Sequence, residues 1–179
     1  SPREFLLAMV SRRVHVMQTS APLWRREFLA TRSGWRSDIG FGDDLEFNAR
    51  MLCQCQRTAF ADAELFWVRE HASERLSEIS GDARKVASAV RTRLALRESL
   101  QTAALWNAAM QGAFVDALRG VYSMVLTYSA SAELRSFEKF YASCALRPLP
   151  RPGVFLLVAA RKLFGARALI GAHAFLNQL

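Results

Sequence analysis

Hydrophobic residues recur at helical spacing through most of the second half of the chain. Over residues 83–128 they fall three or four positions apart, which predicts one helical stretch that Gly112 and Gly120 are expected to divide into two or three helices. Residues 132–144 continue the same pattern. After a proline-rich connector, a last helix is predicted over residues 154–177.

The first part of the chain has shorter apolar runs and more turn residues, and it predicts strands as well as helices. The predicted elements are strands at residues 14–19, 57–61 and 64–69 and helices at residues 24–30 and 43–55. We therefore expect a helix-rich α/β protein. Its predicted parts are residues 1–82, with a few short strands, and a mainly α-helical region at residues 83–179.

The chain carries a net charge of +8, and arginine supplies most of the excess. This charge favours acidic partners such as nucleotides, phospholipid headgroups or nucleic acid. Nucleic acid is not expected, because the sequence lacks a helix-turn-helix signature, zinc-ligand spacing and an aromatic RNA-binding strand. Four arginines open the second part: Arg84, Arg91, Arg93 and Arg97. They predict either a solvated face or a contact with anionic lipid.

The three cysteines are Cys53, Cys55 and Cys144, and no Cys-x-x-Cys is present. Reduced thiols are expected, with neither a disulfide framework nor a zinc site. No uncharged apolar run is long enough for a transmembrane helix, and no signal peptide is predicted. The expected location is the cytoplasm, or the inner face of the membrane as a peripheral protein. Because the chain begins within an apolar segment, it is predicted to be a piece of a longer protein.

Two adjacent carboxylates, Asp43 and Asp44, stand where a glycine loop leads into a predicted helix. In one interpretation Asp43 is the N-cap, Glu46 completes a capping box and Asp44 is an acidic first-turn residue. In the other, the pair does chemistry, with one carboxylate acting as a general base beside a metal-bound or phosphate-bearing substrate. The spacing alone favours the cap.

Several short motifs occur in a characteristic order. They are Leu23-Trp24-Arg25-Arg26, Gly34-Trp35-Arg36, Asp43-Asp44 with Arg50, and Trp67-Val68-Arg69-Glu70-His71 followed by Ser73 and Ser77. In this order, residues 10–80 resemble the acceptor-side half of the catalytic domain of family 2 glycosyltransferases, which have the GT-A fold. The resemblance implies transfer of a sugar from a nucleotide-diphosphate donor to a hydroxyl of a glycan or lipid-linked acceptor.

The same resemblance implies roles for individual residues. Asp44 corresponds to the base that deprotonates the acceptor hydroxyl, and Asp43 helps to position the acceptor or the base. His71 corresponds to the histidine that reaches the metal or the diphosphate. Trp24 and Arg25 lie where such enzymes approach the acceptor and the donor diphosphate.

Arg69 is a further substrate-binding candidate in the same motif. A divalent cation, Mn²⁺ or Mg²⁺, is expected to stabilise the leaving diphosphate, and a histidine ligand suits Mn²⁺ better.

The chain also departs from this family, because it has no Asp-x-Asp motif and no nucleotide-binding half ahead of residue 14. It is therefore interpreted as a fragment of a glycosyltransferase that is inactive alone. The rival hypothesis is a basic helical module that binds a membrane surface or an acidic partner, without catalysis. In that hypothesis the helices after residue 83 carry the function, and the acidic pair only caps a helix.

Overall fold

The computed structural model describes residues 1–11, 21–59, 82–129, 131–144, 159–161, 163 and 165. Within these ranges the chain forms the helices α1 (Pro2–Val10), α2 (Arg26–Ala30), α3 (Asp43–Cys53), α4 (Ala83–Thr102), α5 (Ala108–Tyr128) and α6 (Ser131–Cys144). Residues 159–161, 163 and 165 are also helical.

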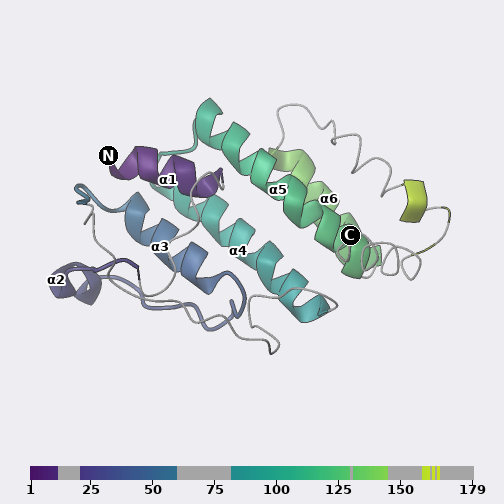
Figure 1. The fold of residues 1–179 in the computed structure, drawn as a ribbon, viewed down its shortest axis with the longest axis horizontal. Helices are drawn as coiled ribbons and strands as arrows, with labels where there is room; N and C mark the ends of the chain where they lie inside the picture. The colour runs from purple at the N-terminus through teal and green to yellow at the C-terminus, as the bar shows by residue number, and fades with distance from the viewer. Residues whose placement is uncertain are drawn as a thin grey trace.

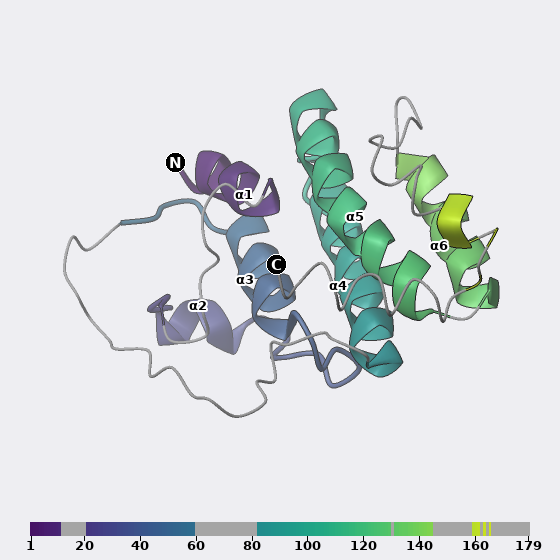
Figure 2. The same cartoon turned by 45° about the vertical axis from the view of Figure 1, so that its right-hand side comes forward.

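The helices pack side by side, and neighbours in space are mostly neighbours in the sequence (Figure 1). Helix α3 packs on α4, α4 on α5, and α5 on α6, while α1 contacts both α3 and α5. Helices from both sides of residue 82 thus lie against one another. Figure 2 shows α2 on the side of α3 away from α4, at the opposite end of the molecule from α6.

The core forms where the apolar faces of these helices meet. Helix α5 runs through its centre and buries residues at helical spacing, including Met110, Phe114, Leu118 and Val121. Helix α1 closes one side of this core with Leu6, Met9 and Val10, and α6 closes another with Phe137 and Tyr141. Each helix therefore buries its apolar stripe against another helix.

The expected α/β fold class is wrong, because the described residues contain helices and no strand. The predicted strands at residues 14–19 and 64–69 lie outside the described residues, as do positions 60 and 61 of the strand predicted at 57–61. Residues 57–59 are irregular. A GT-A acceptor half needs a sheet for its helices to cover, whereas here helices supply the packing surface for one another.

The helical predictions agree better with the structure. The helix expected at residues 43–55 forms as α3, the one at 24–30 as the shorter α2, and the one at 132–144 as α6. The helical stretch predicted over residues 83–128 is divided, but not at the glycines, since Gly112 and Gly120 both lie inside α5. The break falls instead at residues 103–107. Of the last predicted helix, only residues 159–161, 163 and 165 are described.

A Schellman motif makes this break. The backbone N–H of Leu105 donates to the carbonyl of Leu100 at 2.9 Å, and that of Ala104 donates to Gln101 at 3.0 Å. Ala104 takes the left-handed position of the motif, with φ of 55°. Leu105 and Leu100 are both buried there, so hydrophobic burial holds the turn despite the strain at an alanine.

Replacing Ala104 by glycine should therefore stabilise the protein by about 1 kcal/mol, because glycine adopts this conformation without a Cβ clash. Urea unfolding followed by circular dichroism would measure the change. The matched control is Ala103→Gly, since Ala103 has φ of −80° and should gain nothing. A stability gain at Ala103 equal to that at Ala104 would contradict the strain argument.

Candidate functional site

The acidic pair lies at the start of α3, but neither carboxylate is the cap. Gly42 is the N-cap, in a left-handed conformation with φ of 77°, and Asp43 is the first helical residue. The predicted Asp43–Glu46 capping box is therefore wrong. Glycine takes the cap position because the loop enters the helix at positive φ, and the side chain of Glu46 binds Arg50 instead.

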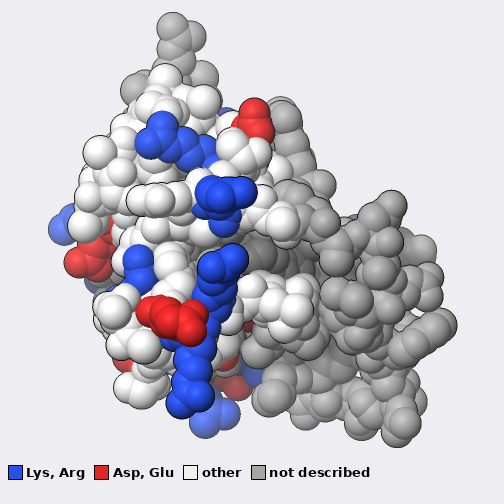
Figure 3. Space-filling view, turned by 90° about the vertical axis from the view of Figure 1, so that its left-hand side faces the viewer, with Lys and Arg blue, Asp and Glu red and all other residues white. Residues whose placement is uncertain are grey.

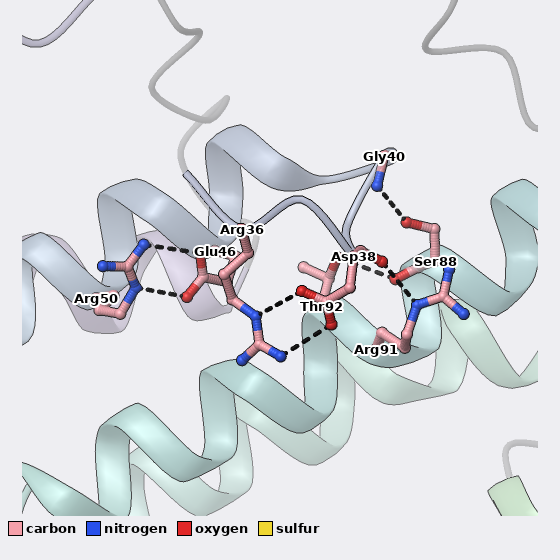
Figure 4. A network of polar contacts seen from close by, with 8 residues as sticks. All are labelled: Arg36, Asp38, Gly40, Glu46, Arg50, Ser88, Arg91 and Thr92. Carbon is pink, nitrogen blue, oxygen red and sulfur yellow. Dashed lines mark hydrogen bonds and ion pairs between the residues drawn. The ribbon is translucent and has the colours of Figure 1, made fainter. Parts of the chain in front are cut away.

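Hydrogen bonds to α4 hold the loop that precedes the acidic pair (Figure 4). The Ser88 hydroxyl accepts from the backbone N–H groups of Gly40 at 2.9 Å and Phe41 at 2.8 Å. The Thr92 hydroxyl donates to the carbonyl of Phe41 at 2.9 Å, and Arg91 Nε donates to the carbonyl of Asp38 at 2.9 Å. These contacts satisfy backbone groups that no regular element pairs.

Close packing adds to the constraint on Gly42. A Cβ placed on Gly42 would lie 3.1 Å from Thr92 Oγ1 and 3.3 Å from Thr92 Cγ2. Glycine is therefore required here for two reasons: the left-handed backbone conformation and the close approach of α4.

At the acidic pair itself, Asp44 is half-buried and its Oδ1 accepts a hydrogen bond from the backbone N–H of Leu45 at 2.7 Å. Burial raises the pKa of the Asp44 carboxyl above its ordinary value, and the charge of Asp43 raises it further. A raised pKa makes a carboxylate a better proton acceptor. Asp44 is in this respect suited to a base.

A buried ion pair lies further along α3. Arg50 Nε and one of its terminal nitrogens donate to the two carboxylate oxygens of Glu46, at 2.7 and 3.2 Å. The Glu46 side chain is only 2% exposed. Arg50 also donates to the backbone carbonyls of Ser33 and Gly34, each at 2.8 Å. The pair thus links α3 to the segment that follows α2.

Two tryptophans, one before and one after α2, also contact α3. The Trp24 indole N–H donates to Asn48 Oδ1 at 3.3 Å, and its ring stacks on Phe28. The Trp35 ring stacks on Phe47 with centroids 4.3 Å apart. Both indoles therefore contribute to the packing around α3.

The predicted site residues are only partly brought together. Asp43 and Asp44 are adjacent at the start of α3, and Trp24 and Arg25 lie just before α2. No hydrogen bond or ion pair between described residues joins either aspartate to Trp24 or Arg25. Arg69 and His71 lie outside the described residues, so their predicted roles in substrate and metal binding stay predictions.

Sequence reasoning missed the Glu46–Arg50 pair. Its signal was present, because a glutamate four residues before an arginine on a predicted helix is a favourable ion-pair spacing. It also missed Ser88 and Thr92, which sit one turn apart on α4 and face the loop. The sequence alone gives no reason to connect that helix with residues 40–42.

In the described part of the chain, no three His, Cys, Asp or Glu side chains come close enough together to hold a metal ion. The predicted divalent cation thus stays a prediction. The three cysteines are free, and burial raises the pKa of the Cys53 thiol to about 11.

No family model, no curated protein sequence and no solved structure matches this chain. The identification as a GT-A acceptor half is wrong, because the region that should carry it packs as helices and shows no sheet in its described residues. The motifs behind it are short, and several mark helix starts: Arg25 and Arg26 open α2, and Asp43 and Asp44 open α3.

Gly42→Ala should destabilise the protein by about 2 kcal/mol, from left-handed backbone strain together with the contact against Thr92. Thermal and urea unfolding would measure the loss. Gly40→Ala is the matched control, because no atom lies within 4 Å of a Cβ built there. An equal loss in the two variants would show that the loop is not held as described.

Arg50→Met should cost about 3 kcal/mol, because it leaves the Glu46 carboxylate buried without its partner. The control is Arg36→Met, since the Arg36–Asp38 pair is exposed and should be worth under about 1 kcal/mol. Chemical denaturation of both variants would test the difference. Similar small losses would mean that the Glu46–Arg50 pair does not hold residues 33–34 against α3.

Proposed function

We propose that this chain binds an acidic partner, and that it does so away from the arginines that open its second part. Three of those four arginines are buried or contact other parts of the fold. Arg93 is buried, with 7% of its surface exposed. Arg97 donates to the Ser143 hydroxyl at 2.8 Å and lies over the Trp106 ring, and Arg91 binds the loop before α3. This stretch is therefore not the continuous solvated face that its composition allowed.

Exposed positive charge gathers instead at the outer end of the molecule, where α1 begins and α2 lies. We call this surface the basic edge and define it by Arg3, Arg25, Arg26 and Arg57, which are all exposed. None of the four forms an ion pair with another described residue. Figure 3 views the molecule from this side and shows blue atoms running down the middle of the face, with fewer red ones.

The four residues come from three parts of the chain: the start of α1, the start of α2 and the irregular segment after α3. An open hollow of about 410 Å³ is lined by the first residues of α1, including Arg3, and by Leu52 to Gln56 at the end of α3. Arg57 follows directly. Arg32, just after α2, donates to the Gln54 side chain at 3.1 Å, which ties α2 to the same end of α3.

We propose that the chain is a non-catalytic helical module that binds an acidic partner surface through the basic edge. The exposed arginines at this edge carry the proposal, because none of them pairs with another described residue and guanidinium groups without such partners can bind phosphate or carboxylate groups. None of the helices in the described residues is both long and apolar enough to cross a membrane.

A catalytic role for Asp44 stays a separate prediction. It came from a resemblance that the fold overturns, and its one supporting observation is the raised pKa of the carboxyl. No described histidine, metal cluster or second catalytic group accompanies it. The basic edge has the stronger support because several elements contribute to one surface.

The double variant Arg25→Gln, Arg26→Gln should elute from a heparin column at clearly lower salt than the wild type. Removing two cations removes two counterion-releasing contacts. The matched control is Arg135→Gln, Lys139→Gln, which removes two exposed cations from α6 at the far end. An equal shift in both variants would show that net charge, and not the basic edge, sets the binding.

A further inference from the structure

One large apolar side chain stands almost free beside the basic edge. Leu23 is 90% exposed, and Arg25 and Arg26 follow it two and three positions later. Exposed single leucines are common, so exposure alone decides little. The relevant feature is how the residue is presented.

The neighbouring residue, Trp24, anchors the backbone at Leu23. Trp24 turns inward, where it donates to Asn48 on α3 and stacks on Phe28 at a centroid distance of 5.6 Å. Phe28 is covered in turn by the Arg32 guanidinium, 3.6 Å from its ring centroid. The backbone at Leu23 is thus anchored through the adjacent residue while its own side chain projects from the surface.

We infer that the acidic surface recognised by this edge is an anionic lipid bilayer, with Leu23 inserting below the headgroups and Arg25 and Arg26 binding lipid phosphates. This inference rests on the proposed function and names its partner. A projecting aliphatic side chain next to two cations matches an interface where phosphate groups overlie hydrocarbon.

A nucleic acid fits this surface less well. Binding to a nucleic-acid backbone uses cations, and binding to bases uses exposed aromatic rings for stacking. Here the neighbouring aromatic side chain, Trp24, is committed to α3, and an exposed leucine adds nothing to a phosphate contact. The positive charge together with the exposed Leu23 side chain therefore favours an anionic lipid surface over a nucleic acid.

The test is sedimentation of the full chain with vesicles of phosphatidylcholine alone and with vesicles that contain 30% phosphatidylglycerol. The wild type should bind the anionic vesicles in low salt, bind the neutral ones at least tenfold more weakly, and detach in high salt. Leu23→Ser should weaken binding to the anionic vesicles by about tenfold, the loss expected when most of one leucine side chain is no longer buried.

The matched control is Leu163→Ser, because Leu163 is 75% exposed and lies two positions after Arg161, which donates to carbonyls at the end of α5. Both ribbon views show this end of α5 far from α2. Its binding should stay within twofold of the wild type. Circular dichroism would verify that both variants keep their helices, as expected for such exposed positions.

The outcomes separate this inference from the proposed function. If Leu23→Ser binds anionic vesicles as the wild type does, or if no vesicle binding occurs while heparin binding still depends on Arg25 and Arg26, lipid insertion is wrong and the acidic-surface module stands. If neither vesicles nor heparin bind in low salt, both proposals fail.

Discussion

The buried ion pair between Glu46 and Arg50 is the contact on which the outer part of this structure depends. A carboxylate taken out of water must be neutralised or hydrogen-bonded, and Arg50 does this along the same helix. Arg50 then has donors left, and these bind the carbonyls of Ser33 and Gly34. The Glu46–Arg50 pair thereby holds residues 33–34 against α3, in the same stretch of chain that carries Trp24, Trp35, Arg25 and Arg26.

A second set of contacts joins α3 to the rest of the fold. The loop at residues 38–42 is bound to α4 through Ser88, Arg91 and Thr92, and α4 is packed on α5 in the core. The surface proposed to bind acidic partners is therefore connected, helix by helix, to the buried centre. Its cations are presented on a fixed frame, which reduces the ordering cost of binding.

Arginine has two separate uses in this chain, and the net charge of +8 does not distinguish them. Within α4, Arg93 is buried and Arg97 lies over the Trp106 ring. Arg161 donates to the carbonyls of Leu126 and Ser129 at the end of α5, where a cation also suits the helix macrodipole. Only the exposed arginines without such partners among the described residues are candidates for the proposed binding surface, so composition overstates the available charge.

The sequence by itself determined where most of the described helices form, because the spacing of apolar residues reflects which side of a helix can be buried. It indicated the helix that starts at Asp43 and the helical nature of residues 83–128. It did not place the break between α4 and α5. Burial of Leu100 and Leu105 stabilises that break, whereas Gly112 and Gly120, where a break was expected, lie inside α5. Only the tertiary structure decided that Glu46 pairs with Arg50 and that Arg93 is internal while Arg25 is exposed. The physical reason is that residue type and spacing report local preference, whereas burial and ion pairing depend on which helices meet.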